Sequence, residues 1–102
     1  MKKVCAVYKI VNNKTGDFYI GSSVDCKRRW AEHRKPSRWN TCKNKMYEYM
    51  KENGTSDFTM FPILFVDPEN LKQVEQEAIE MFQPTYNLIY SVGVDEERFS
   101  KT

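Results

Sequence analysis

Two apolar runs near the N-terminus constrain the fold of this chain more than any other feature. Residues 4–11 are apolar and largely β-branched apart from Lys9, and residues 18–20 form a second, shorter run. Between them, residues 12–17 are rich in turn formers, and Gly16 can adopt the positive φ that turns often require. The pattern predicts two antiparallel strands joined by a loop somewhat longer than the tightest hairpin type.

A helix is predicted directly after this hairpin. Ser22 or Ser23 can cap its N-terminus, and Pro36 predicts its end, because the residue before a proline disfavours helical geometry. At helical spacing, Arg29 and His33 share the inward-leaning face, whereas the other basic side chains of this segment point elsewhere.

The rest of the chain predicts one more strand and two more helices. After a loop at residues 36–39, a second helix is expected over residues 41–53, and residues 58–66 read as a third strand. Pro62 lies within that strand and cannot donate a ladder hydrogen bond, so the strand is expected at a sheet edge or with a local bulge. The sequence Asp-Pro-Glu at residues 67–69 predicts the start of a third helix that ends near residue 83.

A chain of 102 residues fits a single domain over residues 1–102, with a core at about 4–90 and a C-terminal tail at 91–102. Residues 88–90 are predicted to add a short strand, and the charged residues 95–102 are expected to fray. The fold class expected is α/β, a small three-stranded, mainly antiparallel sheet flanked by helices.

Composition restricts the class of protein further. No apolar stretch is long enough to cross a membrane, and the N-terminus reads as a strand rather than a signal peptide, so a cytoplasmic protein without membrane partners is expected. The three cysteines, Cys5, Cys26 and Cys42, are dispersed and form no CxxC pair. This arrangement argues against a disulfide framework and against a structural zinc site.

The charge is segregated along the chain. Residues 1–53 hold 13 Lys or Arg and 5 Asp or Glu, a net charge of +8, whereas residues 54–102 hold 3 and 9, a net charge of −6. A basic half of this kind suggests a polyanionic partner, although a solvated basic helix would give the same pattern. The candidate nucleic-acid-binding residues are Lys27, Arg28, Arg34, Lys35, Arg38, Lys43 and Lys45.

Glu75 is the sharpest single candidate for chemistry. It lies inside the apolar stripe of the third helix, four residues after Leu71 and three before Ala78. A carboxylate on a core-facing stripe is costly unless it is paired or holds a metal. A salt bridge to Arg29 is one explanation. The other is a site for Mg²⁺, which accepts one carboxylate together with waters and phosphate oxygens.

Other polar side chains could complete such a site. Tyr8 and Tyr19 pack well in strands, and chemistry at their hydroxyls would need a neighbouring cation to lower the phenol pKa. Arg29 could clamp a phosphate with two parallel hydrogen bonds. His33 could instead be a packing or surface residue, and Asn87 could simply cap a turn.

In order along the chain, these residues resemble a known family. The elements are Ala6-Val7-Tyr8, Tyr19-Ile20-Gly21, Arg29 with His33 one turn later, Glu75 on the last helix, and Asn87. The pattern resembles the GIY-YIG nuclease family from about residue 4 to residue 88. The first tripeptide departs from the family pattern by Ala6 in place of glycine and Val7 in place of isoleucine.

The resemblance implies a divalent-metal-dependent endonuclease that hydrolyses phosphodiester bonds in DNA, with no organic cofactor. By this resemblance, Glu75 holds one Mg²⁺ or Mn²⁺, and Tyr8, helped by His33 or a nearby cation, takes a proton from the attacking water. Arg29 neutralises the phosphoryl oxygens, while Tyr19 and Asn87 orient water and neighbouring groups. A covalent role for Tyr8 stays open at this point.

Two alternatives compete with this interpretation. One is a non-catalytic nucleic-acid-binding module on the same fold, and the other is an interaction domain whose basic face binds an acidic protein. The sequence leaves open whether DNA or RNA is cut, which form of substrate is preferred, and the oligomeric state.

Overall fold

The computed structural model describes residues 3–41 and 44–87. In chain order the elements are β1 (Ala6–Asn12), β2 (Phe18–Ser23), α1 (Cys26–His33), α2 (Pro36–Thr41), α3 (Lys45–Asn53), β3 (Phe58–Phe65), the 3₁₀ helix η1 (Pro68–Asn70) and α4 (Leu71–Phe82). Among the described residues, no helix has both the length and the apolar character needed to cross a membrane.

The three strands form one antiparallel sheet with β1 in the centre, in the order β2-β1-β3. This confirms the predicted hairpin and the predicted fold class. The hairpin strands differ slightly from expectation, since β1 begins at Ala6 and β2 continues as far as Ser23. In this register Tyr8 lies opposite Gly21 of β2 and opposite Pro62 of β3.

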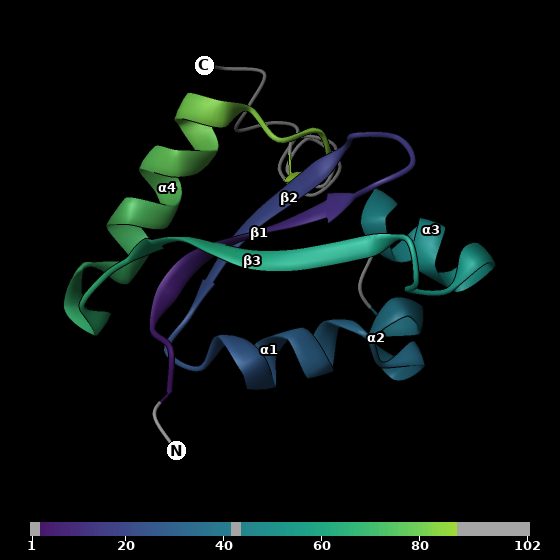
Figure 1. Ribbon diagram of the computed structural model, residues 1–102, viewed down its shortest axis with the longest axis horizontal. Coiled ribbons are helices and arrows are strands. Elements are labelled where there is room, and N and C mark those ends of the chain that lie inside the picture. Colours follow the sequence, from purple (N-terminus) through teal and green to yellow (C-terminus); the bar gives the residue numbers. More distant parts are fainter. Residues whose placement is uncertain (1–2, 42–43, 88–102) are drawn as a thin grey trace.

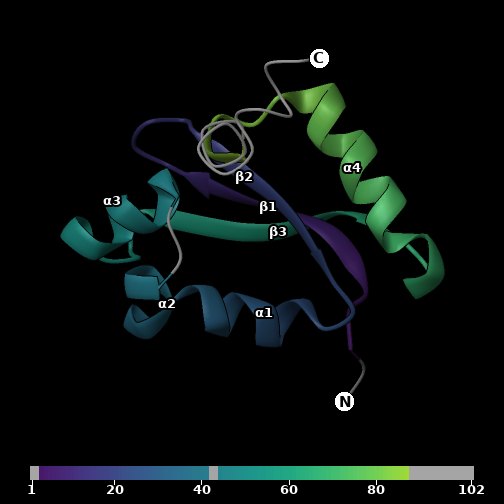
Figure 2. The same cartoon turned by 180° about the vertical axis from the view of Figure 1, so that it is seen from behind.

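Helices cover both faces of the sheet. Figure 1 shows α4 on one side and α1, α2 and α3 on the other, and Figure 2 shows the same arrangement from behind. Alternation along β1 supplies two separate cores. Ala6, Tyr8 and Ile10 pack in the cluster that includes α3, whereas Val7 packs with Ile20 and the buried residues of α4.

The third strand confirms the expectation drawn from Pro62. β3 is an edge strand of the described sheet, and its pairing with β1 shifts register between Val7 and Tyr8, directly beside Pro62. A residue without an N–H is tolerated there, because an irregular edge strand does not need a complete ladder.

The beginning of α1 corrects one prediction. Asp25, rather than Ser22 or Ser23, is the N-cap, and its carboxylate accepts a hydrogen bond from the backbone N–H of Arg28 at 3.2 Å. Ser23 instead accepts a hydrogen bond from the N–H of Asp25 at 3.0 Å. The cap therefore lies further along the chain because β2 extends to Ser23.

The segment after α1 was predicted wrongly as a loop. Residues 36–39 belong to α2, and Pro36 stands at its first position, where a missing N–H costs nothing. The next helix, α3, begins at Lys45 instead of residue 41, because Asn44 caps it through a 2.8 Å bond from the N–H of Tyr47.

The last predicted helix is present with a modified start. Asp67 and Pro68 begin the short helix η1, and α4 proper follows from Leu71. It ends at Phe82, and Gln83 adopts the left-handed conformation with φ of 51°. The predicted strand at residues 88–90 and the tail at 91–102 lie outside the described residues.

Candidate active site

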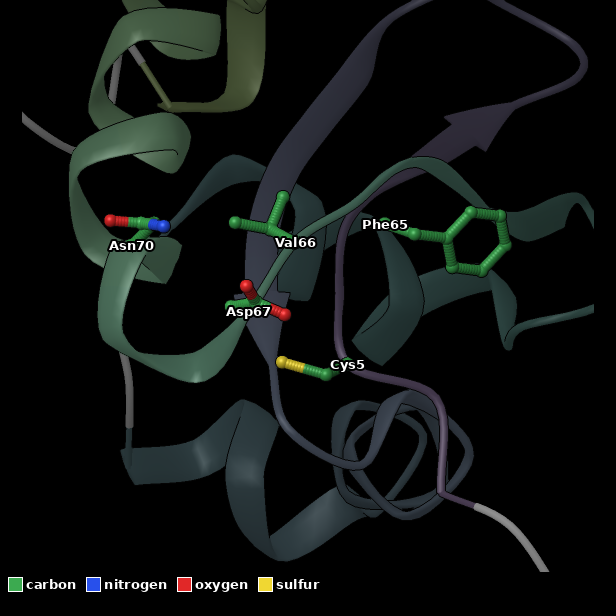
Figure 3. A pocket seen from close by; sticks show the side chains of 5 residues that line it. All are labelled: Cys5, Phe65, Val66, Asp67 and Asn70. Atoms are coloured by element: carbon green, nitrogen blue, oxygen red, sulfur yellow. The ribbon is translucent and has the colours of Figure 1, made fainter.

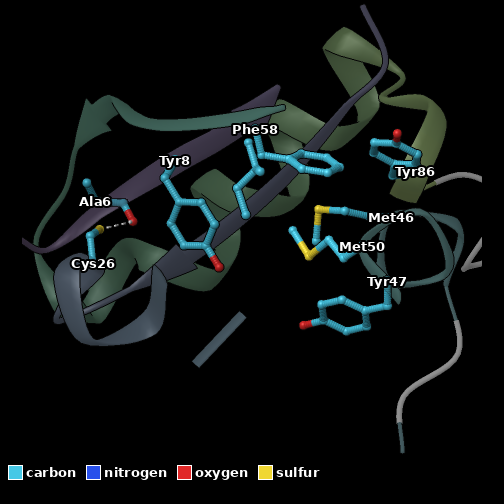
Figure 4. Packing of buried hydrophobic residues seen from close by; sticks show 9 residues of the cluster. Ala6, Tyr8, Cys26, Met46, Tyr47, Met50, Phe58 and Tyr86 are labelled. Carbon is cyan, nitrogen blue, oxygen red and sulfur yellow. Dashed lines mark hydrogen bonds between the residues drawn. The ribbon is translucent and has the colours of Figure 1, made fainter. Parts of the chain in front are cut away.

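His33 is the centre of a buried polar cluster between the sheet and the helices. The Tyr8 hydroxyl lies 2.8 Å from its Nε2, and the Tyr47 hydroxyl lies 2.6 Å from its Nδ1. Tyr8 and His33 are each only 1% exposed. In Figure 4 the hydroxyl groups of Tyr8 and Tyr47 point toward a common space, and the hydrogen bonds place the imidazole of His33 between them.

Tyr19 completes the aromatic part of this cluster. Its ring centroid lies 6.4 Å from that of Tyr8 and 5.5 Å from that of His33. Gly21 makes this close packing possible. A Cβ atom at Gly21 would lie 2.5 Å from the Tyr8 hydroxyl oxygen and 2.9 Å from Cε2 of Tyr19. Both distances are shorter than the 3.0 Å below which real Cβ atoms essentially never approach a neighbour.

Arg29 joins the cluster from α1. It is partly buried, its guanidinium donates to Glu32 at 2.8 Å, and it interacts electrostatically with Tyr8. Burial disfavours the charged form, but the bond to Glu32 and the proximity of Tyr8 outweigh it and raise the pKa of Arg29. The guanidinium therefore keeps its charge beside the Tyr8 oxygen. The predicted inward face of α1, with Arg29 and His33, is confirmed.

Burial governs the protonation of the two central groups. It raises the pKa of the Tyr8 phenol, and the neighbouring Tyr19 raises it further, while Arg29 lowers it. Burial also lowers the pKa of His33 to about 3, with the positive charges of Arg29 and Arg38 acting in the same direction. At neutral pH the cluster therefore holds a neutral phenol and a neutral imidazole.

Glu75 lies on α4 and is partly buried. Its Oε1 accepts a hydrogen bond from the Ser22 hydroxyl of β2, and no described cation forms an ion pair with it. The expected alternative, a salt bridge to Arg29, does not form, because Arg29 pairs with Glu32. The negative charge of Glu75 nevertheless contributes to raising the pKa of Tyr8, so the two groups interact electrostatically.

The donor set around Glu75 fits a hard, hydrated cation. Among the described residues, no group of three or more His, Cys, Asp or Glu side chains could enclose a metal. A zinc site would need three or four such ligands, whereas Mg²⁺ is commonly held by one or two carboxylates together with waters and substrate phosphates. A half-buried carboxylate with one oxygen oriented by Ser22 suits the second case.

Asn87 is placed by its own hydrogen bonds. Its Oδ1 accepts from the N–H of Ile20 at 2.7 Å, and its Nδ2 donates to the carbonyl of Ile20 at 2.8 Å. Ile20 lies between Tyr19 and Gly21, and Asn87 is 6% exposed. The amide therefore fixes the backbone that carries Tyr19.

The predicted basic surface is only partly organised. Lys27, Arg34 and Lys35 are exposed and belong to no described ion pair, whereas Arg28 pairs with Glu32 and Lys45 with Glu48. Arg38 is partly buried, and its Nε donates to the Tyr47 hydroxyl at 3.4 Å. Lys43 lies outside the described residues.

Sequence reasoning missed three residues of the candidate site. Ser22 orients Glu75, Tyr47 contacts His33, and the indole N–H of Trp39 donates to the His33 carbonyl at 2.8 Å. Alternation along β2 could have placed Ser22 on the face of α4. Nothing in the sequence pairs Tyr47 or Trp39 with His33, because they lie on separate helices.

A pocket of about 500 Å³ lies away from this cluster, where β3 meets η1. Figure 3 shows its lining, Cys5, Phe65, Val66, Asp67 and Asn70, and none of these residues was predicted to act in the site. This pocket therefore lies apart from the residues that the sequence predicts for the site.

Comparison with known proteins gives one family and one fold. The model of the GIY-YIG catalytic domain matches residues 4–87, so the chain belongs to the GIY-YIG family of nuclease catalytic domains. No curated protein gives a convincing match over its sequence.

Two solved structures share the fold. The catalytic domain of homing endonuclease I-TevI is 17% identical, with a TM-score of 0.62 over 78% of this chain and 88% of that one. A mutant of the catalytic domain of intron endonuclease I-TevI is 16% identical, with a TM-score of 0.65 over 78% of this chain and 84% of that one. At these identities the likeness concerns the fold.

Proposed function

We propose that this domain is a divalent-metal-dependent endonuclease that hydrolyses phosphodiester bonds in DNA. One observation carries the proposal. The buried Tyr8–His33 pair lies beside the charged guanidinium of Arg29, and Glu75, a carboxylate without a described cationic partner, accepts a hydrogen bond from Ser22, which directly follows the Gly21 that lies opposite Tyr8. A general base, a cation for phosphoryl oxygens and a metal ligand are the groups that phosphodiester hydrolysis requires.

Glu75 would hold the ion, with Ser22 fixing the orientation of the carboxylate. When bound, Mg²⁺ or Mn²⁺ supplies a Lewis acid that withdraws charge from the phosphate and from the leaving oxygen. The GIY-YIG nucleases in general depend on a divalent metal, and the lone carboxylate here agrees with one ion per site.

Tyr8 acts in this proposal as the base, in the phenolate form that results when the neutral phenol of the free protein loses its proton to solvent. The phenolate oxygen takes a proton from water, the water oxygen bonds to phosphorus, and the bond from phosphorus to the leaving oxygen breaks. Solvent then protonates the leaving oxygen. Arg29 neutralises the phosphoryl oxygens and also offsets part of the effect of burial on the pKa of Tyr8.

DNA is the substrate that the fold and the surface favour. The structures that share the fold are catalytic domains of an intron or homing endonuclease. Lys27, Arg34 and Lys35 are exposed and lie on or directly after α1, on the side of the sheet that carries the buried cluster around His33. Such side chains suit phosphate contacts, which position a duplex without reading its sequence.

The direct test is cleavage of supercoiled plasmid with Mg²⁺, with Mn²⁺ and with EDTA, using wild type, Glu75→Gln and Glu77→Gln. Glu77 lies on the same helix, is exposed and hydrogen-bonds only to Gln73 among the described residues, so it is a matched control. We expect wild type and Glu77→Gln to nick or linearise the plasmid with metal only. Glu75→Gln should fold, as circular dichroism would show, and be inactive.

Other outcomes point to the alternatives. Cleavage that is insensitive to EDTA, or equal in both glutamine variants, would remove Glu75 from the reaction. DNA binding without cleavage would favour a binding module, and the absence of both would favour a protein partner for the basic face. A parallel reaction with single-stranded and duplex RNA decides between DNA and RNA as substrate.

A further inference from the structure

The proposed reaction leaves one buried contact without a role. Tyr47 is 3% exposed and contacts the far nitrogen of His33, Nδ1, on the side away from Tyr8. A neutral imidazole carries one proton, so one ring nitrogen donates and the other accepts. Tyr47 and Tyr8 therefore cannot play the same part, and the direction of the two hydrogen bonds decides what Tyr8 experiences.

The two distances favour one direction of donation. A separation of 2.6 Å between Nδ1 and the Tyr47 oxygen is shorter than the roughly 2.7–3.2 Å of bonds from an N–H donor to oxygen, whereas hydroxyl donors approach oxygen acceptors to roughly 2.5–3.0 Å. The 2.8 Å between Nε2 and the Tyr8 oxygen fits an N–H donor. Tyr47 would thus give its proton to Nδ1, and Nε2–H would point at Tyr8.

The surroundings of Tyr47 favour the same direction. Nε of Arg38 is an obligate donor, and it faces the Tyr47 oxygen at 3.4 Å. A phenol oxygen that accepts from a guanidinium becomes a better donor through its own hydroxyl. The backbone that carries the phenol is fixed as well, because the N–H of Tyr47 donates a hydrogen bond to the Asn44 side chain at the beginning of α3.

His33 is equally well held. The indole N–H of Trp39 donates a hydrogen bond to the backbone carbonyl of His33. The rings of Tyr8, Tyr19 and Tyr47 surround the imidazole, with centroids 5.5–5.8 Å from its centroid. Because its pKa is lowered to about 3, the ring is uncharged at neutral pH. What its neighbours then decide is which of the two ring nitrogens carries the proton.

We propose that Tyr47 is a positioning residue that holds His33 in the tautomer protonated on Nε2, which directs an N–H donor at the Tyr8 oxygen. Together with Arg29, this donor stabilises the phenolate of Tyr8 against the effect of burial, since hydrogen bonds to the charged form favour that form. The catalytic consequence rests on the proposed nuclease function, whereas the tautomer itself does not.

The chain offers an unusually clean readout, because His33 is its only histidine. In protein labelled with ¹⁵N-histidine, a long-range ¹H–¹⁵N correlation spectrum at pH 7 resolves the two nitrogens of this one ring. The sample for this spectrum contains neither metal nor DNA. In the wild type we expect Nε2 protonated and Nδ1 bare. A wild-type spectrum with the proton on Nδ1 overturns the proposal without any variant.

Tyr47→Phe removes the donor to Nδ1 while keeping the ring. We expect the Nδ1-protonated tautomer to become populated. In plasmid cleavage, kcat should fall roughly 10- to 100-fold, by analogy with the range for hydrogen-bond partners that orient metal ligands, with KM for DNA unchanged within error. Tyr49→Phe is the control on the same helix, because it loses a comparable bond to Asp57 without touching His33. It should leave both the ¹⁵N spectrum and kcat as they are in the wild type.

The spectrum and the kinetics separate two kinds of failure. An unchanged tautomer in folded Tyr47→Phe contradicts the proposal, whatever the enzyme does. A shifted tautomer with kcat equal to that of the wild type contradicts the catalytic consequence. If the wild-type protein cleaves no nucleic acid, the proposed function fails, and the tautomer experiment still gives its answer.

Discussion

The two tyrosine tripeptides differ in how strictly their glycine positions are constrained. Ala6 begins the first tripeptide, where the family pattern has glycine, and its side chain is fully buried among core residues. That position therefore accepts a methyl group. Gly21 ends the second tripeptide, and there a methyl group would overlap Tyr8 and Tyr19. The difference follows from register, because Gly21 lies directly opposite Tyr8.

Substitution of Gly21 by alanine should disturb the site and the fold together. The new Cβ would lie 2.5 Å from the Tyr8 hydroxyl oxygen and 2.7 Å from Tyr8 Cζ, so the ring must move. We expect a loss of unfolding free energy of about 1–3 kcal/mol in urea titrations, the usual cost of overpacking. Plasmid cleavage should fall in parallel, because Tyr8 leaves its position beside His33.

A double-mutant cycle identifies the cause of this loss. In a Tyr8→Phe background the nearest overlapping atom is absent, so Gly21→Ala should cost less stability than in the wild type. Equal costs in the two backgrounds would show that the strain arises elsewhere, in the backbone of β2.

At this scale, residue type and spacing predicted much of the candidate cluster, and contacts between elements were not predictable. Tyr8, Tyr19, Arg29 and His33 come from neighbouring segments, and the structure brings them together. Tyr47 was not predicted, because the position of α3 relative to α1 depends on tertiary packing that no local pattern encodes.

At the scale of elements, the region between α1 and α3 was the least predictable. Pro36 correctly indicated the end of one helix, but it also starts α2, and a proline in the sequence does not distinguish these two roles. Asn44 then caps α3, so the helix predicted over residues 41–53 begins in the structure only at Lys45, and Thr41 belongs to α2. The strands, by contrast, followed from the apolar runs of the sequence, and Pro62 indicated the irregular edge.

Asn87 joins the C-terminal end of the described chain to β2. Its amide makes two hydrogen bonds to Ile20. Among the described residues β2 pairs only with β1, so Asn87 satisfies backbone groups that would otherwise be left without partners. Asn87→Ala should lower the unfolding free energy by about 2 kcal/mol, the value of two buried hydrogen bonds. Urea titration measures this loss.

Asn53→Ala is the matched control for that experiment. Asn53 is exposed at the end of α3 and bonds to the carbonyl of Tyr49 at 3.2 Å. Its removal should change stability by no more than about 0.5 kcal/mol. Similar effects at the two asparagines would mean that Asn87 does not hold β2 in solution.

At the scale of the whole molecule, the charge asymmetry of the sequence becomes an asymmetry between the faces of the sheet. The basic segment forms α1, α2 and the start of α3, on one side, whereas α4 on the other side carries Glu75, Glu77 and Glu80 (Figure 1). This arrangement could be predicted only in part, because the sequence gives the charges but not which face each helix covers.

Binding to DNA should therefore be weak, largely independent of sequence and strongly dependent on salt. The exposed cations without a described ion pair, Lys27, Arg34 and Lys35, would make about three phosphate contacts. Three contacts weaken binding roughly 40-fold between 50 and 200 mM salt, by release of condensed counterions. Fluorescence anisotropy with a labelled duplex in EDTA measures this slope without cleavage.

Replacing the three residues by glutamine should flatten the slope, whereas Lys72→Gln on α4 should leave it unchanged. Competition with unrelated duplexes completes the test, since a strong preference for one sequence that persists at high salt would contradict binding through phosphate contacts alone.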